Sequence, residues 1–147
     1  MRRMFVVLAA VFATAALAAP AAFAASPHYV QGPTATVSGN SLTVSWKAAG
    51  LGNTVTSVDF ALTGTANVTS QCFTRSGNPV QGVPKSETVD VNVTGTFPVR
   101  NGQTTGSLTV EPLSTLTCTG NQHVEILSVS FDLTLTGDDL PPVNLTG

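Results

Sequence analysis

Charged side chains are scarce in this chain of 147 residues: they make up 10% of it, as six Lys or Arg and eight Asp or Glu. Binding to nucleic acid or to an anionic membrane surface requires basic side chains that gather on one face. The basic residues that follow the N-terminal Arg pair are scattered, at Lys47, Arg75, Lys85 and Arg100. The sequence therefore argues against a nucleic-acid partner and against electrostatic attachment to a membrane.

Histidine and cysteine, which many catalytic and metal sites use, are also rare, with two of each. No G-x-S-x-G nucleophile motif and no H-E-x-x-H metal motif occurs. A structural zinc site needs four Cys or His ligands in close pairs, and none of these residues is paired in sequence. The adjacent Asp138 and Asp139, with Asp132 before them, lack the spaced ligands of a calcium loop. We predict that the protein is not an enzyme and holds no metal or cofactor.

Only one long apolar run occurs, and it lies at the N-terminus. Residues 2–3 are Arg, residues 4–19 are apolar and rich in Ala, and residues 22–24 (A-F-A) place small side chains where a signal peptidase cuts. The run is short for a membrane span of about 20 residues. We interpret residues 1–24 as a signal peptide, read by the general secretory route or, as the alternative, by the twin-arginine route. The mature chain is then secreted, to the extracellular space or the cell envelope, with no membrane span.

The rest of the chain is rich in Thr, Val and Ser, which suit a pleated strand. Apolar and polar residues alternate with a period of two, as at Leu42, Val44 and Trp46. This alternation changes phase between Ile126 and Leu127, which predicts a β-bulge there. We predict strands over 34–38, 41–47, 55–63, 65–73, 87–97, 104–111 and 123–136, with turns at Gly39-Asn40, Gly64 and Asn101-Gly102.

Short antiparallel strands that each have one apolar face predict two packed sheets. We expect an all-β fold, an immunoglobulin-like antiparallel β-sandwich of about seven strands, with a small open barrel as the alternative. Trp46 shares its face with apolar residues and is expected in the core. Residues 25–137 are expected to form a single domain, and residues 138–147 a frayed C-terminal tail.

The two cysteines, Cys72 and Cys118, are predicted to form a structural disulfide. An exported chain meets an oxidising environment, and an even number of cysteines leaves none unpaired. A reactive thiolate is stabilised by a helix N-terminus or by clustered cations, whereas Arg75 is the single cation near Cys72.

The segment 73–85, rich in Gly and Pro, is the candidate binding loop, because long loops on a rigid scaffold carry recognition. A plain connection between strands is the alternative. Its candidate contact residues are Phe73, which is out of phase with Cys72, together with Arg75 and Asn78. The expected partner is an extracellular protein or a glycan.

Several short stretches of the chain follow a common order: G-L-G-N at 50–53, Cys72 with Gly77-Asn78 and Gly82, N-G-Q at 101–103, and Cys118. In this order the chain resembles an uncharacterised group of small secreted bacterial β-sandwich proteins with one cysteine pair. The resemblance implies fold and export and implies no activity. The chain departs from the group where Asn and Gly often follow the first cysteine, and where Pro and Trp follow the second, at Thr74, Ser76, Thr119 and His123.

Two functions compete on this basis. The first is a secreted, non-catalytic binding or cell-surface module. The alternative is a secreted hydrolase inhibitor whose loop 73–85, stiffened by Pro79 and Pro84, occupies an active site. An enzyme is a third reading, and it requires a carboxylate or hydroxyl partner for His123.

Overall fold

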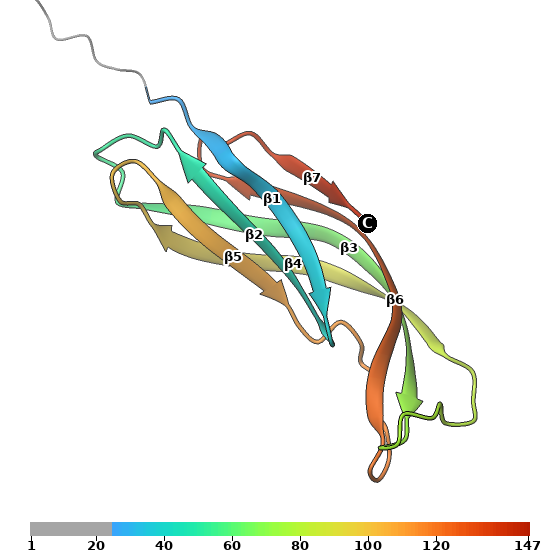
Figure 1. The fold of residues 1–147 in the computed structure, drawn as a ribbon. Helices are drawn as coiled ribbons and strands as arrows, with labels where there is room; N and C mark the ends of the chain where they lie inside the picture. The colour runs from blue at the N-terminus through green and yellow to red at the C-terminus, as the bar shows by residue number, and fades with distance from the viewer. Residues whose placement is uncertain (1–24) are drawn as a thin grey trace, which may run out of the picture.

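The computed structural model describes residues 25–147, so the predicted signal peptide at 1–24 lies outside the described residues. The described chain forms two antiparallel sheets and no helix (Figure 1). One sheet has the order β1-β2-β5, and its strands are β1 (His28–Ser38), β2 (Ser41–Ala49) and β5 (Thr104–Val110). The other has the order β4-β3-β6-β7, and its strands are β3 (Ser57–Phe73), β4 (Lys85–Pro98), β6 (His123–Gly137) and β7 (Val143–Thr146).

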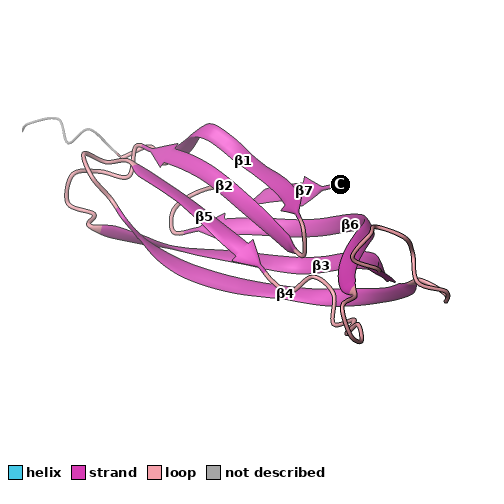
Figure 2. Ribbon diagram, turned by 60° about the horizontal axis from the view of Figure 1, so that its bottom comes forward, coloured by secondary structure: helices cyan, strands magenta, loops and turns pink. Residues whose placement is uncertain are grey.

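This architecture confirms the prediction of an all-β sandwich with seven strands. Figure 2 shows the two sheets as separate layers. Within residues 25–147, no helix is long and apolar enough to cross a membrane.

The core fills the space between the two sheets. Trp46 is 2% exposed, and its ring centroid lies 4.4 Å from that of Phe60 and 5.1 Å from that of Phe97. Trp46 is therefore a core residue, as its phase predicted. The other buried apolar residues come mainly from the inward positions of the strands, and they include Leu42, Val44, Val58, Leu62, Ala66, Val68, Leu108, Val110, Leu133 and Leu135.

The turn predicted at Gly64 is wrong, because β3 runs without interruption from Ser57 to Phe73. Gly64 has a φ of 138°, and a Cβ there would clash with the backbone of Asp132 and Leu133 on β6. The glycine is thus required by the close approach of a neighbouring strand rather than by a turn.

The frayed tail predicted at 138–147 is also wrong. Leu140 is 7% exposed, and Val143–Thr146 forms β7, which pairs with residues 132–135 of β6. This strand has only four residues and follows Pro141-Pro142, so its alternation was too short to stand out. The predicted number of seven strands was correct only because two errors cancelled. The prediction divided β3 into two strands and omitted β7.

The predicted bulge and the turns at Gly39-Asn40 and Asn101-Gly102 are confirmed, but only the first of these turns closes a hairpin. Thr69 pairs with Ser128 but Ser70 pairs with Ile126, so Leu127 is the extra residue on β6. Gly39-Asn40 joins β1 to β2, and Asn101-Gly102, both with positive φ, carries the chain from β4 in one sheet to β5 in the other.

Three strands of the larger sheet continue past the end of the smaller one. β5 ends at Val110, opposite Leu42 at the start of β2, while β3, β4 and β6 project further (Figures 1 and 2). The connection from β5 to β6 covers the inner face of this projection, and its Leu113 is fully buried. We call this projection the arm, and it comprises residues 69–88 and 113–128.

Candidate functional site: the arm and its tip

A disulfide between Cys72 and Cys118 ties the arm together. The two Cα atoms lie 5.7 Å apart, and the described chain has no free cysteine. Cys72 is the penultimate residue of β3, and Cys118 precedes the turn that leads into β6. The predicted pairing is confirmed, and the reading of Cys72 as a reactive thiol is excluded.

The loop between β3 and β4 is held by its own backbone. Val80 N–H donates to the carbonyl of Cys72 at 2.9 Å, and Thr74 N–H donates to the carbonyl of Asn78 at 2.8 Å. Phe73 and Pro79 form a bridge between these two bonds. The first half of the loop is therefore a small closed hairpin anchored beside the disulfide.

Side chains reinforce this hairpin. The Thr74 hydroxyl accepts the N–H of Asn78 at 3.1 Å, and the Asn78 amide donates to Ser76 Oγ at 3.3 Å. Gln71 donates to the carbonyl of Val80 at 3.1 Å. Because these bonds restrict the loop before any partner arrives, binding would cost less conformational entropy than for a flexible loop.

The three predicted contact residues have different surroundings. Phe73 is half-buried, and its ring centroid lies 6.4 Å from that of His123. Arg75 is exposed and forms no ion pair within residues 25–147. Asn78 is exposed, but its amide is used inside the hairpin. Arg75 is thus the most available of the three for contact with a partner.

The second half of the loop presents a residue that the sequence analysis missed. Val83 is 94% exposed, and it borders a cleft of about 240 Å³ beside the disulfide, which Leu116 and Val80 also line. Val83 lies between Gly82 and Pro84, outside any segment with alternating apolar and polar residues, so the sequence does not predict its exposure. We refer to residues 73–84 and 119–122 together as the tip of the arm.

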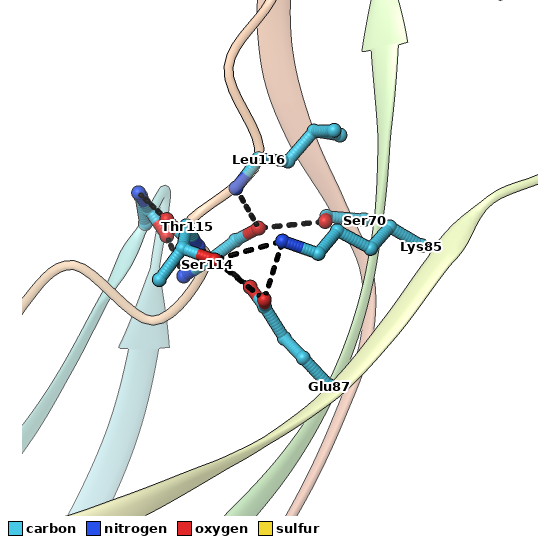
Figure 3. Close-up of polar contacts among 7 residues, drawn as sticks. Ser70, Lys85, Glu87, Ser114, Thr115 and Leu116 are labelled. Atoms are coloured by element: carbon cyan, nitrogen blue, oxygen red, sulfur yellow. Dashed lines mark hydrogen bonds and ion pairs between the residues drawn. The ribbon is translucent and has the colours of Figure 1, made fainter.

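A polar cluster fixes the base of the arm (Figure 3). The buried hydroxyls of Ser70 and Ser114 are 2.7 Å apart, and Ser114 Oγ accepts the N–H of Leu116 at 3.1 Å. On the other side of the connection, Lys85 Nζ lies 2.8 Å from Glu87 Oε2 and donates to Thr115 Oγ1 at 2.8 Å. The connection that carries Cys118 is therefore attached to both β3 and β4.

The same contacts lower the pKa of one carboxyl. Hydrogen bonds from the Lys85 side chain, then from the Thr115 hydroxyl and backbone, lower the pKa of Glu87 from 4.5 to about 2. Glu87 is thus ionised over the whole physiological range, and its charge is compensated within the cluster.

His123 has the carboxylate partner that an enzymatic reading requires. Its Nε2 lies 2.9 Å from Oε1 of Glu125, two residues along the same strand. Residues two apart on a strand lie on the same face, so this pair could have been predicted from the sequence. The two side chains are 50% and 45% exposed, and among residues 25–147 no hydroxyl or thiol forms a hydrogen bond with the His123 ring. The pair is an exposed hydrogen bond, and within residues 25–147 no nucleophile is bonded to it.

No group of three or more His, Cys, Asp or Glu side chains within residues 25–147 is arranged to hold a metal ion. Comparison of the sequence with models of known families and with curated proteins finds no match to either.

Proposed function

We propose that this chain is an exported, non-catalytic binding module that acts outside the cell or at its envelope and contacts a protein partner with the tip of the arm. The observation that carries the proposal is the tip itself. A rigid loop projects beyond the sandwich, is anchored by a disulfide, and exposes an apolar side chain and an unpaired cation. Such a surface loses little conformational entropy when it binds, because its loop is already ordered.

The order of the strands supports an immunoglobulin-like classification within this proposal. In the lettering of immunoglobulin domains, β1-β2-β5 take the places of A-B-E, and β4-β3-β6-β7 take those of C′-C-F-G. The domain departs from antibody domains in its disulfide, which joins the end of strand C to the connection before strand F rather than strand B to strand F.

The chemistry of the tip favours a protein over a glycan. Carbohydrate recognition commonly uses an exposed flat ring, whereas Phe73 is half-buried against His123. Protein interfaces instead combine exposed apolar anchors with Arg, which is the pairing offered by Val83 and Arg75.

The test is affinity capture with the mature domain as bait, using proteins secreted by the producing organism. Arg75→Ala and Val83→Asp should each deplete the captured partner. Arg100→Ala is the matched control, because Arg100 is an exposed arginine at the opposite end of β4 from the arm. Identical capture by wild type and both tip variants would refute the assignment of the tip, and capture of a polysaccharide alone would replace the protein partner with a glycan.

A second candidate function, inhibition of a secreted hydrolase, is favoured by the fixed backbone of the loop. Inhibitory loops must stay rigid while occupying an active site, and both the disulfide and the closed hairpin provide rigidity. An inhibition panel against secreted proteases and glycosidases discriminates the two functions. Full activity of every enzyme with the domain at micromolar concentration would exclude inhibition of those enzymes.

A further inference from the structure

The outer edge of β6 is stepped. β7 covers the half of the edge away from the arm, where it pairs with residues 132–135, and Gly147 continues the ladder by exchanging backbone hydrogen bonds of 2.7 and 3.1 Å with Phe131. Residues 123–130 of β6 pair with β3 on one side, and within residues 25–147 they have no backbone partner on the other. The edge therefore contains a vacant strand position in line with β7 (Figure 1).

This vacant position borders a groove that both apolar and polar groups line. The groove has a volume of about 450 Å³ and runs between residues 124–129 of β6 and the end of β1 with its turn, at Val37 and Gly39. Leu127, the bulged residue, is 46% exposed, and Val37 across the groove is 42% exposed. These are two of the four large apolar side chains that the described chain leaves exposed.

Two of the other edge strands carry features that oppose strand addition. β4 begins with Lys85, whose charge is shared with Glu87, and ends at Pro98. β1 contains Pro33 and two register shifts. The open stretch of β6 has a bulge, but that bulge presents a leucine, and the stretch contains neither lysine nor proline.

We propose that residues 123–130 of β6 form a homodimer interface, in which this stretch pairs antiparallel with the same stretch of a second copy about a two-fold axis. A stepped edge is complementary to itself. Rotation by 180° about the two-fold axis places the open half of one β6 against the open half of the other. Each β7 then lies in line with the β6 of the other copy, beyond the end of that strand. The interface is isologous and closes at two copies. Its backbone hydrogen bonds continue the β6–β7 ladder, and its side chains cover Leu127 and Val37.

The charges of the groove are compatible with a second copy as the occupant. Glu125 is the only ionisable residue that lines it, and its carboxylate is already bonded to His123 at 2.9 Å. Two such surfaces therefore meet without a cluster of unpaired like charges, which would oppose symmetric pairing. The inference is independent of the proposed role of the tip.

The test is sedimentation equilibrium of the mature domain up to about 1 mM, a concentration at which even a weak association is populated. Wild type should form a dimer and no larger species. Leu127→Lys should raise the dissociation constant at least about tenfold, because two lysines would face each other near the axis. Val37→Lys provides a second variant on the opposite wall. Val30→Lys is the matched control, since Val30 is 51% exposed on β1 but does not line the groove.

Hydrogen exchange supplies a readout specific to strand pairing. The amides of residues 124–130 that point away from β3 should become protected as wild-type concentration rises. They should not do so in Leu127→Lys, whose melting temperature is checked to establish folding. A monomer at about 1 mM would overturn the proposal. A dimer that Leu127→Lys and Val37→Lys leave unchanged, or that leaves these amides unprotected, would also overturn it.

Discussion

Thr115 binds both carboxylate oxygens of Glu87: its backbone N–H donates to Oε1 at 2.6 Å, and its hydroxyl donates to Oε2 at 2.7 Å. The two residues belong to different segments, since Glu87 lies on β4 and Thr115 lies in the connection from β5 to β6. With the buried pair of Ser70 and Ser114, this contact determines where the chain crosses the arm on its way to Cys118.

The first prediction concerns Glu87 and pH. Its pKa is about 2 in the folded protein against an ordinary value of 4.5, so the ionised carboxylate stabilises the fold above pH 4.5, and this contribution is lost as pH falls from 4.5 towards 2. We expect Glu87→Gln to lower the free energy of unfolding at neutral pH, and the difference from wild type to vanish near pH 2. Urea unfolding at a series of pH values measures this difference.

Glu111→Gln is the control, because Glu111 is exposed and forms no ion pair within residues 25–147. A difference that does not change with pH would contradict the assignment.

The second prediction compares two glycines of positive φ. A Cβ on Gly64 would clash with the backbone of β6, whereas a Cβ on Gly77 in the loop meets nothing within 4 Å. We expect Gly64→Ala to cost more than about 3 kcal/mol of unfolding free energy, because backbone strain is added to a clash that neither strand can relieve. Gly77→Ala should cost only about 1–2 kcal/mol, the strain of its φ alone. Equal losses in thermal unfolding would show that the contact with β6 is unimportant.

Gly64 also shows where prediction of the fold from sequence fails. The alternation of side chains identifies the strands on either side of it because alternation is a local property. From its sequence neighbours alone, a glycine inside a strand is predicted to be a turn. The reason for this glycine, the close approach of β6, lies far away in the sequence. The same limit applies to β7, whose four residues acquire their meaning from pairing with β6.

A third prediction tests whether the last ten residues are part of the fold. Leu140 is 7% exposed and closes the core beside Gly137 and Phe60. Leu140→Ala should lower the free energy of unfolding by about 2–5 kcal/mol, as expected for a buried leucine. Pro142→Ala, at an exposed neighbouring position, should lower it by no more than about 1 kcal/mol, the effect of a proline on the entropy of the unfolded chain. A Leu140→Ala variant as stable as wild type would restore the description of residues 138–147 as a tail.

The candidate site could be predicted only in part, again for a spatial reason. The pairing of Cys72 with Cys118 was predicted from the even number of cysteines and the expected export, and the loop 73–85 was predicted from its composition. The exposure of Val83 depends on how the loop folds back on β3, and the cluster around Glu87 joins residues 28 apart in sequence. No local pattern records such contacts.

The fourth prediction concerns the disulfide, which we expect to stabilise the arm more than the sandwich. Cys72 and Cys118 are separated by 46 positions, and loss of the cross-link from a loop of that length corresponds to about 4 kcal/mol in the loop-entropy account. Stability of small domains totals about 5–15 kcal/mol, so the double variant Cys72→Ala, Cys118→Ala should melt at a much lower temperature while keeping its β-sheet circular dichroism in the cold.

Hydrogen exchange should locate this loss. The arm contains only the outer ends of three strands and extends past the end of the sheet β1-β2-β5. Amides of residues 70–73 and 123–126 should therefore exchange faster in the double variant. Amides of residues 58–62, which lie over the core around Trp46, should change less. Wild type treated with a reductant should behave like the double variant, which controls for the two alanines. Thiol labelling of the unfolded, unreduced protein should find no free thiol, and two free thiols per chain would show that the purified protein lacks the bond.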